Sequence, residues 1–319
     1  MKRTYFFCTI LFAFWCMTVN AQKQPHTFKV IPLGIYGGSD ESNLSCYMVG
    51  INNTDKYVCL DAGTLHAGID IAIKEKVFTT TTNTVLRNNI QGYLISHPHL
   101  DHLAGLIINS PDDTTKHIYG LPFCLDVITD KYFSWKSWAN FGDAGEQPLL
   151  KKYHYNRLLE GSEIALANTN MFVTAFEISH ANPYQSTAFL VRTDSAYVLY
   201  LGDTGADEIE RSTKLQELWN RVTPLIKTKQ LKGIFIETSF PDEQPNEKLF
   251  GHLTPSLLMK ELKNLSLLCG EDNLQNVPII ITHIKPSGNN EIIIKNELKQ
   301  ENTQDLQLVF PKQGKQFLL

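Results

Sequence analysis

Three histidines and one aspartate within a stretch of six residues are the side chains of this sequence best suited to chemistry. They are His97, His99, Asp101 and His102, in the run His-Pro-His-Leu-Asp-His. The whole chain has 10 histidines in 319 residues, so a loop that is rich in histidine by chance is a poor explanation. Neutral imidazoles and carboxylates are ligands of zinc and similar divalent ions, and a metal site with open positions can catalyse a reaction.

The spacing of these four side chains favours two metal ions over one. His97 and His99 can reach one ion from a bent loop, whereas Asp101 and His102 point elsewhere and can reach a second ion. The apolar residues 93–95 before the run predict a strand, and the apolar stretch 103–108 predicts the helix that follows. The strand therefore delivers the four ligands to its C-terminal end.

Three later loops can complete such a site, because each places a candidate ligand directly after an apolar run. The candidates are His180, Asp203 and His283. A single residue of this kind is more often a structural polar residue than a ligand. The three become good candidates only if the fold brings them next to the first cluster. Asp203 stands in the run Gly-Asp-Thr-Gly, and its short anionic side chain suits a carboxylate that bridges two cations.

Asp61 ends an early apolar run and has a different expected role. We predict that it accepts a hydrogen bond from a ligand imidazole rather than binding metal itself. The alternative is that Asp61 caps the helix that follows it.

The order of elements predicts two mixed sheets packed face to face with helices outside. Each half of the chain has strands first and then alternating strands and helices, which is the order that such a sandwich requires. We found no internal repeat and no long linker, so residues 22–319 are expected to form one domain. Strands are expected at 27–36, 46–51, 56–61, 93–95, 171–178, 187–192, 197–201, 232–237 and 277–282, and helical segments at 66–77, 103–108, 206–222, 255–268 and 290–298.

Residues 1–21 have the pattern of a signal peptide. Lys2 and Arg3 precede the apolar segment 5–17, which is short for a bilayer, and small residues stand before Gln22 at the expected cleavage site. An uncleaved membrane anchor is the alternative. No later stretch is apolar enough to span a membrane, so we expect a periplasmic or secreted protein without stable membrane insertion after cleavage.

The composition argues against some classes of binding partner, but it does not decide whether the cysteines form disulfides. The chain has 29 basic and 33 acidic residues, a formal net charge of −4, and no block rich in Lys or Arg, which argues against long nucleic acids as partners. A small anionic substrate remains compatible, because bound metal ions can outweigh the net charge. Four widely spaced cysteines either pair as disulfides or are buried as free thiols: Cys46, Cys59, Cys124 and Cys269.

The run from His97 to His102 resembles the HxHxDH motif of the metallo-β-lactamase superfamily, and the other candidates fall in the order of its remaining motifs. The resemblance implies a four-layer αββα sandwich of the α/β (α+β) class, with a dinuclear metal site at the edge between the sheets. It implies one metal bound by His97, His99 and His180, a second bound by Asp101, His102 and His283, Asp203 as the bridge and Asp61 behind the ligands.

Two further motifs narrow the resemblance. The segment from His97 to Pro111 resembles the signature of class II 3′,5′-cyclic-nucleotide phosphodiesterases. Residues 251–254, Gly-His-Leu-Thr, resemble the His-x-Thr element of the phosphodiesterase branch that includes tRNA 3′-processing enzymes, and Glu237 stands in the corresponding acidic motif.

This resemblance implies hydrolysis of cAMP and/or cGMP to nucleoside 5′-monophosphates. Two metal ions would hold a bridging hydroxide and clamp the phosphoryl group; zinc is expected, with Mn²⁺, Fe²⁺ and Co²⁺ as alternatives. His252 is the candidate that helps the leaving oxygen, and Asp101 is a candidate proton carrier. The alternative for His252 is a residue at a helix N-terminus without catalytic duty.

The aromatic-rich insertion near residues 130–160 allows two interpretations. Its rings, Trp135 and Trp138 among them, could stack on a nucleobase, or they could pack beneath the insertion or in a homodimer contact, and packing is favoured.

Two other functions stay open at this point. One is a different hydrolase on the same fold, acting on another phosphodiester, a lactone or a thioester, and the other is a metal-dependent binding protein without catalysis. The preference between cAMP and cGMP also stays open, because it depends on geometry.

Overall fold

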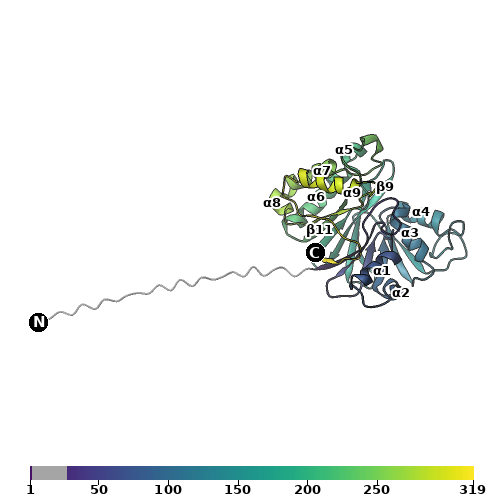
Figure 1. The fold of residues 1–319 in the computed structure, drawn as a ribbon. Helices are drawn as coiled ribbons and strands as arrows, with labels where there is room; N and C mark the ends of the chain where they lie inside the picture. The colour runs from purple at the N-terminus through teal and green to yellow at the C-terminus, as the bar shows by residue number, and fades with distance from the viewer. Residues whose placement is uncertain (2–26) are drawn as a thin grey trace.

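The structure, a computed structural model, describes residue 1 and residues 27–319. Two seven-stranded sheets pack face to face, and helices cover their outer faces (Figure 1). The two-sheet sandwich predicted from the sequence is therefore confirmed. The predicted signal peptide, residues 1–21, lies outside the described residues apart from Met1.

The first sheet has the strand order β14-β1-β2-β3-β4-β5-β6. Strands β1, β2 and β3 pair antiparallel, whereas β3, β4, β5 and β6 run parallel, so this side of the sheet is built by crossover connections. The strands are β1 Phe28–Gly34, β2 Cys46–Ile51, β3 Tyr57–Leu60, β4 Ile90–Leu94, β5 Lys116–Gly120, β6 Tyr153–Arg157 and β14 Phe317–Leu318.

The second sheet has the order β13-β12-β11-β10-β9-β8-β7. Its last four strands from β10 to β13 run parallel, and β7 to β10 form an antiparallel meander. The strands are β7 Glu163–Leu166, β8 Met171–Ser179, β9 Gln185–Thr193, β10 Ala196–Tyr200, β11 Leu231–Glu237, β12 Ile279–Thr282 and β13 Leu308–Val309.

The helices form the two outer layers. Helices α1, α3 and α4 lie on the side of the first sheet, and α6, α7 and α9 lie on the side of the second (Figure 1). The helices are α1 His66–Lys74, α2 Thr82–Thr84, α3 Leu100–Asn109, α4 Pro122–Val127, α5 Asp207–Glu210, α6 Lys214–Lys227, α7 Pro255–Cys269, α8 Glu271–Leu274 and α9 Asn290–Glu301, with short turns η1 Val85–Asn89, η2 Ile128–Tyr132 and η3 Asn246–Lys248.

Three apolar clusters hold the layers together. One lies between the sheets and includes Tyr47, Tyr200 and Phe235, and one lies between each sheet and its helices. Burial of this apolar surface fixes the sheets against each other. The C-terminal ends of the central strands of both sheets then meet at one edge, where their polar loops face one another.

Several helix boundaries differ from the prediction, and two of the differences change which residues begin a helix. The helix after the histidine cluster begins at Leu100 rather than near residue 103, so Asp101 and His102 lie in its first turn. The predicted helix 206–222 divides into α5 and α6, because Arg211 has a left-handed backbone with φ 54°. The Asp207 carboxylate then accepts hydrogen bonds from the amides of Leu215 and Gln216 and stabilises the start of α6.

The aromatic residues of the insertion near 130–160 mostly pack against the protein itself. Phe133 and Tyr153 are buried in the core of the first layer. Trp135 and Trp138 are partly exposed, but their indole N–H groups donate to Pro148 O at 2.8 Å and to Ser110 Oγ at 3.0 Å. The two tryptophans are thereby held by the chain, as the packing interpretation predicts.

The four cysteines of the described segment are free and buried, which is the second of the two predicted alternatives. Burial raises the pKa of the Cys46 and Cys124 thiols, so neither is poised to react. Within the described part of the chain, no helix combines the length and apolar character that a membrane crossing requires.

Candidate metal centre

The structure brings all seven predicted metal ligands together at the edge between the two sheets. They come from four separate segments, each of which follows a strand, and the first segment continues into the start of a helix. His97 and His99 follow β4, Asp101 and His102 begin α3, His180 follows β8, Asp203 follows β10, and His283 follows β12.

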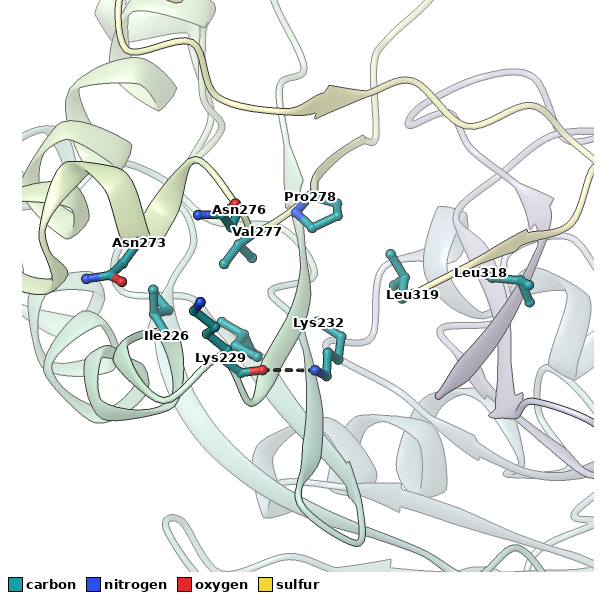
Figure 2. A pocket seen from close by; sticks show the side chains of 10 residues that line it. Ile226, Lys229, Lys232, Asn273, Asn276, Val277, Pro278, Leu318 and Leu319 are labelled. Atoms are coloured by element: carbon teal, nitrogen blue, oxygen red, sulfur yellow. Dashed lines mark hydrogen bonds between the residues drawn. The ribbon is translucent and has the colours of Figure 1, made fainter. Parts of the chain in front are cut away.

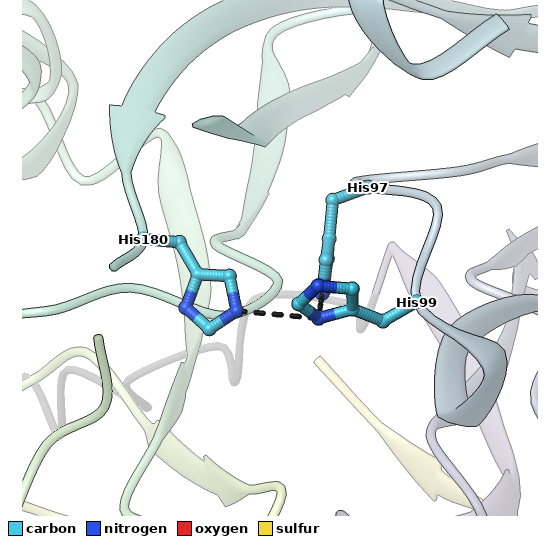
Figure 3. Close-up of side chains that lie close together, drawn as sticks. All are labelled: His97, His99 and His180. Atoms are coloured by element: carbon cyan, nitrogen blue, oxygen red, sulfur yellow. Dashed lines mark hydrogen bonds between the residues drawn. The ribbon is translucent and has the colours of Figure 1, made fainter. Parts of the chain in front are cut away.

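The first group of ligands is His97, His99 and His180. The His99 Nδ1 atom lies 3.0 Å from His97 Nε2 and 3.4 Å from His180 Nε2. Figure 3 shows the three rings turned toward one another from two different parts of the chain. Three imidazole nitrogens lie so close together that the N–H groups of the rings cannot donate a hydrogen bond to every nitrogen lone pair. A cation bound between the rings would accept these lone pairs.

The second group is Asp101, His102 and His283. His283 Nε2 lies 3.1 Å from His102 Nε2 and 3.2 Å from Asp101 Oδ2. The Gly38 amide also donates to Asp101 Oδ2 at 3.0 Å, which holds this carboxylate beside the two rings. Two imidazoles and one carboxylate form a second complete set of candidate ligands.

Asp203 lies between the two groups. Its Oδ2 atom is 3.2 Å from His102 Nε2, 3.3 Å from His283 Nε2 and 3.7 Å from His97 Nε2. Its Oδ1 atom is buried and has no hydrogen-bond partner among the described residues. Because an unpaired buried carboxylate oxygen is costly, this atom fits a site that a cation would occupy. The position suits the bridging role predicted from the sequence.

The electrostatics favour the metal-binding protonation states at His97, His180 and Asp203. Burial lowers the pKa of His97 and His180, so these rings are neutral at physiological pH. Burial alone would raise the pKa of Asp203, but His102 and His283 outweigh it, and the net effect lowers that pKa well below its usual range. Neutral imidazoles and an ionised carboxylate are the forms that coordinate divalent ions. At His102, burial alone would lower the pKa, but the nearby Asp203 and Asp61 carboxylates outweigh it and raise that pKa well above its usual range.

A second layer of hydrogen bonds turns the ligand rings inward. The Nδ1 atom of His102 lies 2.7 Å from Asp61 Oδ2, and that of His180 lies 2.8 Å from Gly251 O. The Nδ1 atom of His283 lies 2.9 Å from Ser239 Oγ. With Nδ1 engaged in each ring, Nε2 is left as the nitrogen that faces the centre, which is the usual arrangement behind metal-bound histidines.

Asp61 makes the contact predicted for it. Besides His102, its carboxylate accepts hydrogen bonds from the Ser96 amide at 2.7 Å and from the Tyr200 hydroxyl at 2.5 Å. The alternative role as a helix cap is wrong, because α1 begins after Leu65 and has no side-chain cap. Asp61 therefore ties the loop after β4 to the second sheet.

His252 lies against the second group of ligands, between the centre and a buried acid. Its Nδ1 atom is 2.7 Å from Glu237 Oε1 and 3.7 Å from Asp203 Oδ2, and its ring stacks on His283. Glu237 is fully buried and also accepts from the Ser239 hydroxyl at 2.5 Å. Burial, assisted by Asp203, raises the pKa of Glu237 to about 7, and burial lowers that of His252 to about 4.

Two features of the site were missed in the sequence. Ser239 joins Glu237 to His283, and Gly37 packs directly beneath the His283 ring, where an added Cβ would lie 2.2 Å from Cε1. The pair Gly37–Gly38 after the first strand was the signal available in the sequence, because a close backbone approach is a common reason for glycine.

Comparison with known proteins agrees with this geometry. The family of class-II cAMP phosphodiesterases matches residues 26–314 of the chain. A 3′,5′-cyclic-nucleotide phosphodiesterase of Aliivibrio fischeri is 38% identical over 94% of this chain and 96% of its own length. A probable 3′,5′-cyclic-nucleotide phosphodiesterase of Yersinia pestis is 35% identical over 90% of this chain and 88% of its own.

A solved structure shares the fold. The crystal structure of unliganded yeast PDE1 superposes with a TM-score of 0.81, covering 92% of this chain and 100% of the yeast chain at 24% identity. A metallo-β-lactamase fold protein of Bacillus subtilis, YhfI, superposes with a TM-score of 0.60, covering 92% of this chain and 100% of its own at 16% identity. The metallo-β-lactamase type of sandwich implied by the sequence is therefore confirmed.

The contact between Asp61 and His102 makes a prediction about metal affinity. Replacing Asp61 with Asn keeps the size of the side chain but removes the charge that orients the imidazole, so metal affinity should fall about 10- to 100-fold. Competition with a coloured chelator measures this affinity directly. Asp55→Asn, at an exposed turn between β2 and β3, is the matched control and should leave the affinity unchanged. Equal affinities for Asp61→Asn and the unmodified protein would contradict the prediction.

Proposed function

Because the chain belongs to the class-II cAMP phosphodiesterase family, we propose that it hydrolyses 3′,5′-cyclic nucleotides, cAMP and/or cGMP, to nucleoside 5′-monophosphates. The observation that carries this proposal is the convergence of His97, His99, His180, Asp101, His102, His283 and Asp203 at one edge of the sandwich. Such a set of ligands suits the clamping of a phosphoryl group far better than the binding of a structural ion.

We propose two divalent ions as the cofactors, with zinc as the expected metal. The His97 group and the His102 group would each hold one ion, and Asp203 would bridge them. Bound there, the ions would lower the pKa of a water molecule so that it could act as nucleophile at neutral pH, and they would compensate charge on the phosphoryl group. The orphaned Oδ1 atom of Asp203 and the inward Nε2 atoms support this assignment.

The remaining chemical demand is a proton for the leaving 3′ oxygen. Attack in line with the bond to this oxygen opens the cyclic ester and leaves an alkoxide, which is a poor leaving group without a proton. We propose that the pair His252–Glu237 provides it. The pKa of Glu237, raised to about 7 by burial and by Asp203, lets the pair hold one transferable proton near neutral pH. Asp101 is proposed as a second proton carrier, since it is the partly exposed member of the second group, whereas His102 and His283 are buried.

We also propose that the protein is exported to the periplasm or secreted. The support is the sequence of residues 1–21, with a basic start, a short apolar segment and small residues before Gln22. A protein exported in this way would meet cyclic nucleotides outside the cytoplasm.

The reaction is tested by incubating the purified, zinc-loaded chain from Gln22 to Leu319 with 3′,5′-cAMP and 3′,5′-cGMP. We expect release of nucleoside 5′-monophosphate, loss of turnover after dialysis against a chelator, and recovery when Zn²⁺ is restored. Asp203→Asn should be inactive even with metal present, whereas Asp194→Asn, on the β9–β10 hairpin, should be fully active. A protein that carries two ions per chain and turns over neither nucleotide would refute the proposed function.

His252 should matter most when the leaving group is poor. We expect His252→Ala to lower kcat for cAMP by roughly 10²- to 10³-fold with unchanged metal content. The same variant should hydrolyse bis(p-nitrophenyl) phosphate nearly normally, because p-nitrophenolate leaves without a proton. His66→Ala, an exposed histidine on α1, is the control. An equal loss on both substrates would mean that His252 only supports the structure.

Export is tested in cells that make the full chain. We expect the mature protein outside the cytoplasmic fraction, with its N-terminus at Gln22 when intact mass is measured. A protein that retains residues 1–21 and stays with the membrane or the cytoplasm would contradict the proposal.

A further inference from the structure

A cavity of about 420 Å³ opens directly beside the first group of ligands, and His97, His99 and His180 form one of its walls. Its size falls in the range of small-molecule sites. Figure 3 shows the rings that border it. A ligand whose charged end sits on the metal centre could therefore extend into this cavity.

The other walls are apolar and aromatic. Phe123 and Val127 of α4 and Tyr132 of η2 come from the first half of the chain, while Pro183 and Tyr184 come from the loop between β8 and β9. None of the described residues that line the cavity is Asp, Glu, Lys or Arg. Such walls suit a neutral, flat group and disfavour a second charged group.

Two tyrosines offer ring faces to such a group. The Tyr132 hydroxyl donates to Pro98 O at 3.0 Å, which fixes this ring next to the ligand loop. Tyr184 is 68% exposed, and its ring centre lies 6.4 Å from that of His99. A large aromatic side chain left this exposed beside a metal centre gains little from folding, and it is well placed to stack on a bound ring.

Gln185 contributes the only side-chain amide of the lining. It begins β9, where its backbone pairs with Ser179, and no hydrogen bond of its side chain to another described residue is found. An amide presents a donor and an acceptor side by side, which matches the N6 and N7 edge of adenine. Against the same edge of guanine, which carries two acceptors, only one of the two bonds can form.

A second cavity helps to exclude other locations for the base. It lies at the opposite, N-terminal ends of β11 and β12, and Lys229 and Lys232 border it (Figure 2). The Lys232 ammonium donates to Lys229 O at 2.9 Å across that cavity. Because the metal ligands follow the C-terminal ends of these strands, a nucleotide bound there could not present its phosphate to the centre.

We propose that the cavity beside His97, His99 and His180 holds the nucleobase, that Tyr184 stacks on it, and that Gln185 reads its edge. This inference rests on the proposed function, because it assigns the base once the cyclic phosphate lies on the metal centre. Tyr184 and Gln185 are then the residues that determine specificity, and Gln185 favours cAMP over cGMP.

The proposal is tested with three substrates that share one scissile bond: cAMP, cGMP and the methyl riboside 3′,5′-cyclic phosphate, which has no base. We expect Tyr184→Ala and Gln185→Ala to raise KM for cAMP by roughly 5- to 100-fold, the size of one lost stacking or paired contact. Turnover of the base-free substrate should stay unchanged. Tyr184→Phe should behave like the unmodified protein, because phenylalanine keeps the ring.

Gln185→Ala should also bring the kcat/KM values for cAMP and cGMP closer together. Gln216→Ala, an exposed glutamine on α6, is the matched control and should change nothing. Unchanged KM for cAMP in both pocket variants, or an equal loss on the base-free substrate, would overturn the proposal.

A binding measurement separates this inference from the proposed reaction. By calorimetry on the zinc-loaded protein, 5′-AMP should bind more tightly than ribose 5-phosphate, and Tyr184→Ala should reduce the difference. Equal affinity of the unmodified protein for the two ligands would refute the base pocket. Failure of the proposed function would look different: the zinc-loaded protein would distinguish these two ligands and still not hydrolyse any cyclic nucleotide.

Discussion

The burial of the Asp203 carboxylate among imidazole rings is the interaction on which the site depends. Its Oδ2 atom lies within 4 Å of five imidazole nitrogens, and its Oδ1 atom has no hydrogen-bond partner among the described residues. Because little water reaches this buried site, the Asp203 carboxylate interacts strongly with the neighbouring imidazoles. Leaving one of its oxygens without a partner costs free energy. The sandwich tolerates this concentration of polar groups because its three apolar clusters carry the stability of the layers.

A layer of hydrogen bonds behind the candidate ligands fixes the orientation of their side chains. Asp61 and Tyr200 connect the two sheets beneath His102, and Ser239 connects His283 to Glu237. The bonds to His102 and His283 each leave the other ring nitrogen facing the centre. The packing of the two sheets therefore determines which way these imidazoles point. A small shift of one sheet against the other would misplace several ligands at once.

The surroundings of the centre differ on its two sides. Toward His97, His99 and His180 the walls are aromatic and uncharged, whereas toward His283 lies the buried, hydrogen-bonded pair His252–Glu237, the proposed proton donor. A cyclic nucleotide has the same asymmetry, with a flat neutral base at one end and an ester bond to be broken at the other. The uncharged aromatic side of the site thus corresponds to the base of the proposed substrate, and the His252–Glu237 side corresponds to the ester bond that is broken.

The sequence alone determined the first four candidate ligands, because His97, His99, Asp101 and His102 lie within one local run whose spacing can be interpreted without knowledge of the fold. It also indicated His180, Asp203 and His283, since each follows an apolar strand and strand ends meet at sheet edges. The sandwich itself followed from the order of strands and helices. The contacts of Ser239 with His283, of Gly37 beneath that ring, and of Gln185 with the cavity were decided only by the tertiary structure. Each joins segments that are distant in the chain, and no local periodicity or propensity encodes which side chains such segments bring together.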